Sequence, residues 1–509
     1  MKLTALFAIL YCFELAYCVV HIIGKESICT LESIQSTVKR ANPSDVVIFG
    51  CLEKVIFITE TIIIDKSITF DGAGKHIISK LANNKALFKI SLSSKPAVFQ
   101  NIHIKNMTIT VASENSIAVL LRHQKANLNV SDVHFLTIGA DYTAIHTQYG
   151  GKVMVTRSTF SDSNKAVVCG FYETFSFVKN HVVSHLKRQG RVVGSTPRMS
   201  YAQRNTRIDF MENKIENGVG LRSTALVQLQ DVKTINFFGN IIRNLQAGLY
   251  AIRFSYSRRI NVKGNIIRNI KGGKANILIS GGFSDIYIEN NVFKENDGSK
   301  VLMMHSLSKV HFISNEIFDN QGRDLHNIKA YNLYYFEVKN NTFINNTATA
   351  VKACVIYASG IRRMNSTENI FVKNLTPKAG AILELNRVRQ FTSTEDFFGG
   401  NTNIQQLFSM SDSKILMKSA VFMCNNGKLG RGTLKIETSI FAAQSTPCNY
   451  SFVSNSVFMR LTNKNIMGNC VNGNTLRNFT RGISDICSHF TNYRMKSDLS
   501  CISSIIKIL

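Results

Sequence analysis

Acidic residues are scarce in this chain, with 33 Asp and Glu against 60 Lys and Arg. Hydrolysis of a glycosidic bond by paired carboxyl groups needs two acids placed on either side of that bond. The low acid content therefore disfavours this type of hydrolase.

Metal-binding cysteine motifs are also missing. No Cys-x-x-Cys pair occurs, and no Cys/His spacing is typical of a zinc site. We expect neither a metal ion nor another cofactor.

The N-terminus has the layout of a signal peptide. Lys2 precedes an apolar run from Leu3 to Phe13, and small residues follow up to Cys18. The run is shorter than the about 20 residues that span a bilayer. We predict residues 1–18 to be a signal peptide and the mature chain to be secreted or to lie on the extracellular surface, without a membrane span. A signal anchor is the alternative.

Glycosylation sequons and cysteines agree with export. Eight Asn-x-Ser/Thr sequons are candidate glycosylation sites, although an Asn-rich chain also contains some by chance: Asn106, Asn129, Asn340, Asn345, Asn365, Asn374, Asn449 and Asn478. Of the nine cysteines after residue 18, we predict a disulfide between Cys29 and Cys51. At least one more is expected among Cys424, Cys448, Cys470, Cys487 and Cys501. The odd count leaves a buried thiol, at Cys169 or Cys354.

The formal net charge of +27 predicts a polyanionic partner. Acidic polysaccharide, nucleic acid or an anionic surface would fit, and the export signals disfavour nucleic acid. A merely basic solvated surface is the alternative reading.

A short phrase recurs along the chain, as in Ile286-Tyr-Ile-Glu-Asn-Asn291-Val-Phe293 and Phe336-Glu-Val-Lys-Asn-Asn341-Thr-Phe343. Its last apolar position defines a column that we expect to point inward: Ile109, Phe135, Phe160, Val182, Ile215, Ile242, Ile267, Phe293, Ile317, Phe343, Phe371, Phe398, Phe422, Phe441 and Val457. Most steps between successive members of this column are 24 to 28 residues long, with one of 22, one of 33 and shorter steps at the end. Such a period fits a coil of three short strands, and the alternation within each phrase fits strands with one buried face.

Two positions before this column stands a second column, of asparagines, which we expect to stack in one turn of the coil: Asn180, Asn213, Asn240, Asn265, Asn291, Asn315, Asn341 and Asn369, followed by Asp396. The leucine skeleton of leucine-rich repeats is missing. Period-two alternation of β-branched and aromatic residues disfavours helical repeats. The sequence therefore predicts an all-β solenoid.

In these features the chain resembles the pectin-lyase-like superfamily of right-handed parallel β-helix proteins, over roughly residues 27–460. Leu31, Ile34 and Val38 mark the amphipathic cap helix with which such proteins often begin. Residues Ile62 to Phe70, followed by Asp71-Gly-Ala-Gly74, resemble their first full coil. We predict an N-terminal cap at 19–50, a parallel β-helix of about 25-residue coils at 51–460, and a Cys-rich C-terminal cap at 461–509.

The resemblance alone does not choose a function, because the superfamily includes lyases, hydrolases, epimerases, adhesins and tailspikes. The carboxylate set of pectin hydrolases, the Arg-x-Pro-x-x-Arg signature of pectate lyases and an acidic calcium cluster are all absent. Lyases and epimerases that act on uronic acids instead need a base near the acidic carbon and a cation or donor that stabilises the developing charge.

Residues of those types line the strands that precede the repeated phrase. Alternation places the following side chains outside: Arg122, His146, Gln228, Arg253, His305, Lys329, Tyr331, Tyr357 and Glu384. We predict His305, Lys329 and Tyr331 as catalytic candidates. Arg253 and Tyr357 are predicted to bind substrate, with Arg253, His305, Lys329 and Tyr357 forming one strip. A one-residue slip in the alignment would exchange the faces.

The 33-residue step is a second candidate for substrate binding. We expect an inserted loop that clamps carboxylate or sulfate groups, because arginine gives bidentate contacts: Arg188, Arg191, Arg198, Arg204 and Arg207. A solvated charged face is the alternative.

Two functions remain open from the sequence. One is a secreted β-helix that engages an acidic polysaccharide, with uronate-directed lyase or epimerase activity as the most concrete chemistry. The other is a non-catalytic surface, adhesion or structural β-helix that binds glycans or a protein.

Overall fold

The computed structural model describes residues 19–469 except the segments 26–27, 93–97, 113–115, 138–141, 163–164, 184–192, 196–205, 221–224, 282–283, 324, 350–352, 377–379, 403–405, 414, 424, 426–427, 431–433, 438–439, 443–450, 453–456 and 462–465. The chain divides into two compact units, Met1–Tyr287 and Ile288–Leu509.

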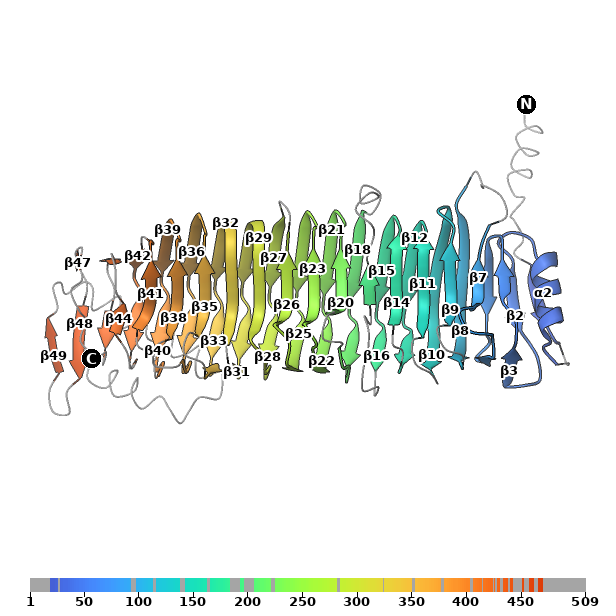
Figure 1. Cartoon of the computed structure of the whole chain (residues 1–509), viewed down its shortest axis with the longest axis horizontal. Coiled ribbons are helices and arrows are strands. Elements are labelled where there is room, and N and C mark those ends of the chain that lie inside the picture. The colour runs from blue at the N-terminus through green and yellow to red at the C-terminus, as the bar shows by residue number, and fades with distance from the viewer. Residues whose placement is uncertain are drawn as a thin grey trace, which may run out of the picture. The chain divides into compact units, whose positions relative to one another are not determined.

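Unit 1 begins with a strand and a helix, β1 (Val20–Ile23) and α2 (Leu31–Arg40). Thr30 caps the helix: its hydroxyl accepts a hydrogen bond from the Ser33 backbone N–H, and the Ser33 hydroxyl accepts one from Thr30 N–H, both at 3.1 Å. The helix buries Ile34, Thr37 and Val38, and it lies at the N-terminal end of the unit (Figure 1). The predicted cap helix is confirmed.

The rest of unit 1 consists of short strands that pair in parallel with the strands of the following coil. They are β2 (Val46–Phe49), β3 (Val55–Ile58), β4 (Ile62–Ile64), β5 (Ile68–Asp71), β6 (His76–Ser79), β7 (Ala86–Ile90), β8 (Gln100–Val111), β9 (Ile117–Arg122), β10 (Ala126–Thr137), β11 (Thr143–Tyr149), β12 (Lys152–Thr156), β13 (Thr159–Ser161), β14 (Lys165–Phe171), β15 (Thr174–Val178), β16 (His181–Val183), β17 (Val193–Ser195), β18 (Arg207–Met211), β19 (Lys214–Glu216), β20 (Ala225–Gln230), β21 (Thr234–Phe238), β22 (Ile241–Gln246), β23 (Tyr250–Ser255), β24 (Arg259–Lys263), β25 (Ile266–Lys271) and β26 (Ala275–Ser280). The strand β27 (Asp285–Glu289) carries the boundary between the units.

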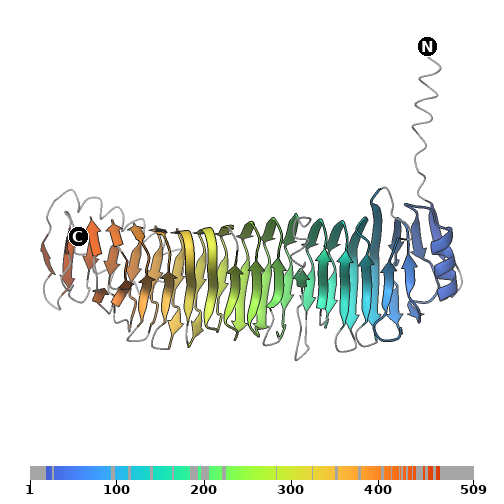
Figure 2. The same ribbon diagram turned by 45° about the horizontal axis from the view of Figure 1, so that its top comes forward.

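Unit 2 repeats this coil, and its last described strand, β49 (Ile466–Asn469), pairs antiparallel with β48 (Val457–Leu461). Its strands are β28 (Val292–Lys294), β29 (Lys300–Ile313), β30 (Glu316–Phe318), β31 (Gln321–Gly322), β32 (His326–Lys339), β33 (Thr342–Ile344), β34 (Thr347–Ala348), β35 (Cys354–Ser359), β36 (Arg363–Thr367), β37 (Ile370–Val372), β38 (Ala381–Asn386), β39 (Gln390–Thr394), β40 (Phe397–Gly399), β41 (Gln406–Ser411), β42 (Ile415–Lys418), β43 (Val421–Met423), β44 (Lys428–Gly430), β45 (Leu434–Glu437), β46 (Ile440–Ala442), β47 (Ser451–Phe452), β48 (Val457–Leu461) and β49 (Ile466–Asn469). Figure 2 shows strands of successive coils stacked side by side within each unit. The parallel β-helix prediction is confirmed.

The predicted apolar column fills the interior of both units. Every member from Ile109 to Phe422 is at most 2% exposed. In unit 2 the rings of Phe343 and Phe371 stack with centroids 4.8 Å apart, and Phe398 and Phe422 continue the stack. One buried ring per coil follows directly from the parallel register, which places the same position of each coil above the last.

The asparagine column forms the expected ladder. In unit 1 each side-chain nitrogen from Asn180 to Asn240 donates to the side-chain oxygen on the next coil, ending at Asn265. In unit 2 the same contact runs from Asn291 to Asp396. These buried amides also donate to strand carbonyl oxygens, so they satisfy polar backbone groups at the turn.

Unit 2 holds a second asparagine ladder that the sequence analysis missed. It consists of Asn296, Asn320, Asn346, Asn374, Asn401 and Asn425. Asn374 is fully buried in it and donates to Phe343 O at 2.9 Å. A glycan has no room there, so the proposal of Asn374 as a glycosylation site is wrong for this fold.

The other sequons differ in accessibility. Asn106, Asn340 and Asn345 are exposed, and Asn129 and Asn365 are half-buried. Asn449 and Asn478 lie outside the described residues.

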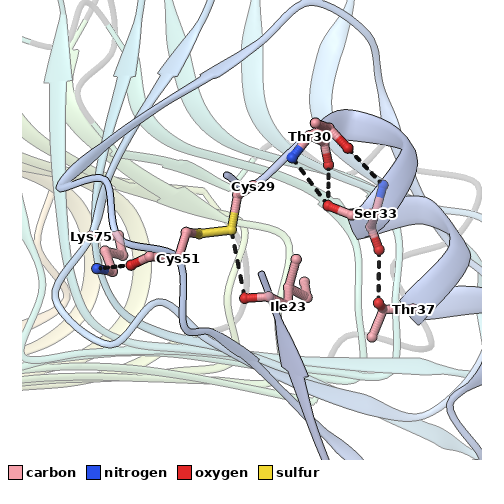
Figure 3. Close-up of a disulfide and its surroundings, with 7 residues drawn as sticks. All are labelled: Ile23, Cys29, Thr30, Ser33, Thr37, Cys51 and Lys75. Atoms are coloured by element: carbon pink, nitrogen blue, oxygen red, sulfur yellow. Dashed lines mark hydrogen bonds between the residues drawn. A yellow bond between two sulfur atoms is a disulfide. The ribbon is translucent and has the colours of Figure 1, made fainter. Parts of the chain in front are cut away.

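Cys29 and Cys51 are joined next to the cap helix, with their Cα atoms 5.4 Å apart (Figure 3). Cys169 and Cys354 are both free and buried, where the sequence analysis expected one such thiol. All five C-terminal cysteines lie outside the described part of the chain, as does most of the predicted C-terminal cap. None of the described helices is long and apolar enough to cross a membrane.

Candidate functional site

The catalytic candidates lie in unit 2 on the neighbouring parallel strands β29 and β32, and the next two strands, β35 and β38, carry Tyr357 and Glu384. On β32 the side chains alternate: Ile328 and Ala330 are buried, whereas Lys329 and Tyr331 are partly exposed. The outward positions of the four strands therefore form one polar surface.

A first column on this surface contains Met303, Lys329, Tyr357 and Glu384, which are in register across the four strands. The Lys329 ammonium lies 5.0 Å from the ring centroid of Tyr357. At this distance the ring face attracts the cation, which keeps the lysine side chain along the column.

A second column contains His305, Tyr331, Ser359 and Asn386. The rings of His305 and Tyr331 stack with centroids 5.1 Å apart and an angle of 9° between their planes. The two rings form a flat platform beside the Lys329 column.

The prediction that Arg253, His305, Lys329 and Tyr357 form one strip is wrong. His305 is in register with Tyr331, and Lys329 is in register with Met303, so the candidates form two columns. Alternation identifies the outward face of a strand, but only the pairing register fixes the position along the strand. Arg253 belongs to unit 1, where its Nε donates to Ser255 Oγ at 3.1 Å.

Other residues predicted to point outward differ in burial. Arg122 is exposed, and His146 and Glu384 are half-buried. Gln228 is in register with Arg253 but only 7% exposed, and its amide donates to Gln230 Oε1 at 2.6 Å, so this outward position is covered. Burial lowers the pKa of His146, and the neighbouring Arg122 and Lys165 add to this effect.

A buried His–Cys pair borders the columns, and the sequence analysis did not single it out. His326 Nδ1 lies 3.1 Å from Cys354 Sγ, and its ring packs against that of Tyr357. Burial, aided by Lys329 and Lys300, lowers the pKa of His326 to about 4, and burial raises the pKa of Cys354. Both shifts leave the pair uncharged near neutral pH. Because a protonated thiol is a poor nucleophile, the pair is a structural support and not a reactive group.

Contacts between a histidine and an acceptor on the next coil recur in both units. His103 lies 2.8 Å from Ser131, His181 lies 2.7 Å from Glu216, and His311 lies 2.6 Å from Glu337. Because the contact recurs at separate places, it serves to join coils and is not by itself a sign of a catalytic dyad. In the described part of the chain, no group of three His, Cys, Asp or Glu residues could hold a metal ion.

The arginine-rich segment is only partly described. Arg188, Arg191, Arg198 and Arg204 lie outside the described residues. Arg207 is in β18 and forms an ion pair with Asp209 at 2.8 Å. The segment also contains the short strand β17, which pairs with β14 and β20, so the long step retains a coil strand where only a loop was expected.

Residues 227–398 match the protein family described as "Right handed beta helix region". A comparison with curated proteins finds no match.

Similar solved structures include bacteriophage CBA120 tailspike protein 3, with 10% identity and a TM-score of 0.38, covering 86% of this chain and 59% of the tailspike. The A-module of an Azotobacter vinelandii mannuronan C-5 epimerase shows 10% identity and a TM-score of 0.39, covering 77% of this chain and 97% of the module. A family 28 exopolygalacturonase of Yersinia enterocolitica shows 11% identity and a TM-score of 0.25, covering 82% and 79%. The chain thus spans less than two thirds of the tailspike. Similarities this remote carry no information about ligands.

Proposed function

We propose that this right-handed parallel β-helix binds an acidic polysaccharide along the two outward columns of unit 2. The observation that carries this proposal is the placement of Lys329 over the Tyr357 ring beside the His305–Tyr331 platform. Cations held against aromatic faces offer both charge and an apolar surface to an anionic sugar chain.

The charge and the geometry favour a polymer over a small ligand. The net charge of +27 attracts a polyanion from a distance. Parallel strands repeat about every 4.8 Å, so the columns offer contacts in series to an extended chain. We propose that this binding takes place outside the cell. The candidate signal peptide at residues 1–18 supports this, and so does the Cys29–Cys51 pair, because disulfides persist in oxidising compartments. Nucleic acid is not the expected partner.

A second candidate function is elimination at a uronate. Lys329 and Tyr331 are alternate residues of one strand, so their side chains leave the sheet roughly 6.6 Å apart on the same face. In this reaction Tyr331 or His305 removes the proton next to the carboxylate, and Lys329 stabilises the developing negative charge. The electron pair forms a carbon–carbon double bond, the glycosidic C–O bond breaks, and the leaving oxygen takes up a proton.

The test compares binding and product formation. Polygalacturonate, alginate and heparin are incubated with the protein while absorbance near 235 nm reports unsaturated uronate, and affinity electrophoresis reports binding. We expect Lys329→Ala combined with Tyr357→Ala to weaken binding to at least one of these polymers at least tenfold. Lys309→Ala is the matched control, because Lys309 is an exposed lysine further along β29.

Two results decide between the candidates. Binding without any rise in absorbance supports a non-catalytic binder and excludes elimination of these polymers. A rise in absorbance that is lost in Tyr331→Phe or His305→Gln, with binding kept, supports elimination. Equal binding by the double variant and Lys309→Ala would contradict the proposed surface.

A further inference from the structure

Unit 1 contains a hollow of about 330 Å³ at the C-terminal ends of β9, β11 and β14, which lie on three successive coils. Pockets for small ligands usually measure about 300–1,000 Å³ and combine aromatic walls with a few polar groups. The size of this hollow suits a ligand of one or two small rings.

Its wall is an aromatic platform. Tyr149 and Phe171 are in register on adjacent coils, and their rings stack with centroids 5.4 Å apart and 19° between their planes. Tyr149 is 38% exposed, and Phe99, which also lines the hollow, is 46% exposed. Exposed apolar side chains that gather in one patch indicate an interaction site, whereas single exposed rings do not.

Two glycines shape the hollow. A Cβ on Gly151 would lie 2.5 Å from the Phe99 ring, and a Cβ on Gly150 would lie 2.8 Å from Leu121. Glycine at position 151 lets the Phe99 ring approach the turn closely, and glycine at position 150 does the same for the Leu121 side chain. Any larger residue at position 151 would displace the Phe99 ring and change the width of the hollow.

Polar groups stand around the aromatic wall, and their charges balance. Lys125 and Glu173 both line the hollow, and Gln124 adds an amide. An anionic ligand would meet Glu173, whereas a neutral ligand rich in hydroxyl groups can use the cation, the carboxylate and the amide as hydrogen-bonding partners.

We infer that this hollow binds a neutral pyranose ring of a glycan. The apolar C–H face of the sugar stacks on the Tyr149–Phe171 platform, and its hydroxyl groups bond to the polar rim. The site is separate from the columns of unit 2 and does not depend on the function proposed for them.

The probe is an array of neutral and acidic oligosaccharides. Wild-type protein should be retained on neutral glycans, and Tyr149→Ala combined with Phe171→Ala should lose that signal at least tenfold. Phe57→Ala is the matched control, because Phe57 is an exposed aromatic residue of unit 1 that does not line the hollow. The single variant Phe99→Ala, which changes only an exposed ring, should also weaken retention even if the double variant folds poorly.

A spectroscopic arm tests the position of the ligand. The chain has no tryptophan, so Phe171→Trp introduces a single reporter. Its emission should change saturably with the neutral oligosaccharide that the array identifies, and not with polygalacturonate. No retention on any neutral glycan, or equal loss in Phe57→Ala, would overturn the inference. Failure of the unit 2 surface would show separately, as unchanged polyuronate binding in the Lys329 and Tyr357 variant.

Discussion

The side-chain nitrogen of Asn341 donates to the side-chain oxygen of Asn369 on the next coil, at 2.9 Å, while the oxygen of Asn341 accepts from Asn315 at 3.0 Å. Asn341 also donates to Phe312 O, and all of these groups are buried. One amide thus links three coils of unit 2, so its removal leaves several buried partners unsatisfied.

We predict that Asn341→Ala lowers the free energy of unfolding by about 2–4 kcal/mol, because each unsatisfied buried group costs about 1–3 kcal/mol. The midpoint of urea denaturation measures the change. Thr342→Ser, at the adjacent half-buried position, keeps the Asn340 sequon and should shift it much less. Equal shifts would mean that the ladder adds no stability.

The phenylalanine stack gives a second prediction. Phe371 packs between Phe343 and Phe398 and is fully buried, so Phe371→Ala should cost about 3–5 kcal/mol, as other large-to-small core changes do. Phe371→Leu should cost less, because it keeps more of the volume. Thermal denaturation of both variants checks the order, and a similar loss in each would contradict it.

Stability should fall in acid partly through His326. Its pKa is about 4 in the folded protein and about 6.5 when unfolded, so the unfolded chain binds more protons between these values. The contribution of neutral His326 to the free energy of unfolding is therefore complete above about pH 6.5. It decreases as the pH falls towards 4, by on the order of 3 kcal/mol.

The urea midpoint at pH 7.0, 5.5 and 4.5 measures this effect, and His326→Gln should show a shallower loss over that range. Burial also lowers the pKa of His103 and His134, which act in the same direction in both proteins. Parallel pH curves for the two proteins would exclude His326 as a contributor.

The Cys29–Cys51 pair closes a loop across a sequence separation of 22, which predicts about 3 kcal/mol of stabilisation. We expect Cys29→Ala combined with Cys51→Ala to melt at a lower temperature than the wild type, and reductant to bring the wild type close to the variant. Mass mapping of unreduced peptides should find the two cysteines linked. Finding both as free thiols would argue against the bond and against export.

The arginine-rich segment is expected to bind anionic glycans by position and not by charge alone. Replacing Arg188, Arg191, Arg198, Arg204 and Arg207 together with Gln should weaken binding to polygalacturonate in addition to any effect of the unit 2 columns. The melting temperature should stay nearly unchanged if the segment is the loop that we expect, since substitutions away from a core rarely exceed about 0.5 kcal/mol each. Binding by the wild type should also weaken with salt. The control replaces five exposed lysines: Lys54, Lys85, Lys233, Lys271 and Lys309. Equal weakening by both sets would show that no site exists there.

Most of the fold could be predicted because each coil repeats the same local pattern. Phe293, Phe343 and Phe371 recur at one position of the phrase, and period-two alternation assigns them to the interior. The ladder of Asn315, Asn341 and Asn369 follows from the same repeat. The second ladder, through Asn346 and Asn374, was not predicted. Its asparagines stand three residues after the apolar column, and Asn374 was interpreted as part of a glycosylation sequon instead.

The sequence by itself determined the coil, its period, the buried column, the first asparagine ladder and the outward face of Lys329 and Tyr331. Only the tertiary structure decided which outward residues meet, because neighbours such as His305 and Tyr331 are a full coil apart in the chain and the register between coils brings them together. The hollow beside Tyr149 is the feature that the sequence predicted least. Its walls come from strand ends and from the turns that follow them on different coils, so the stacking of the coils assembles it.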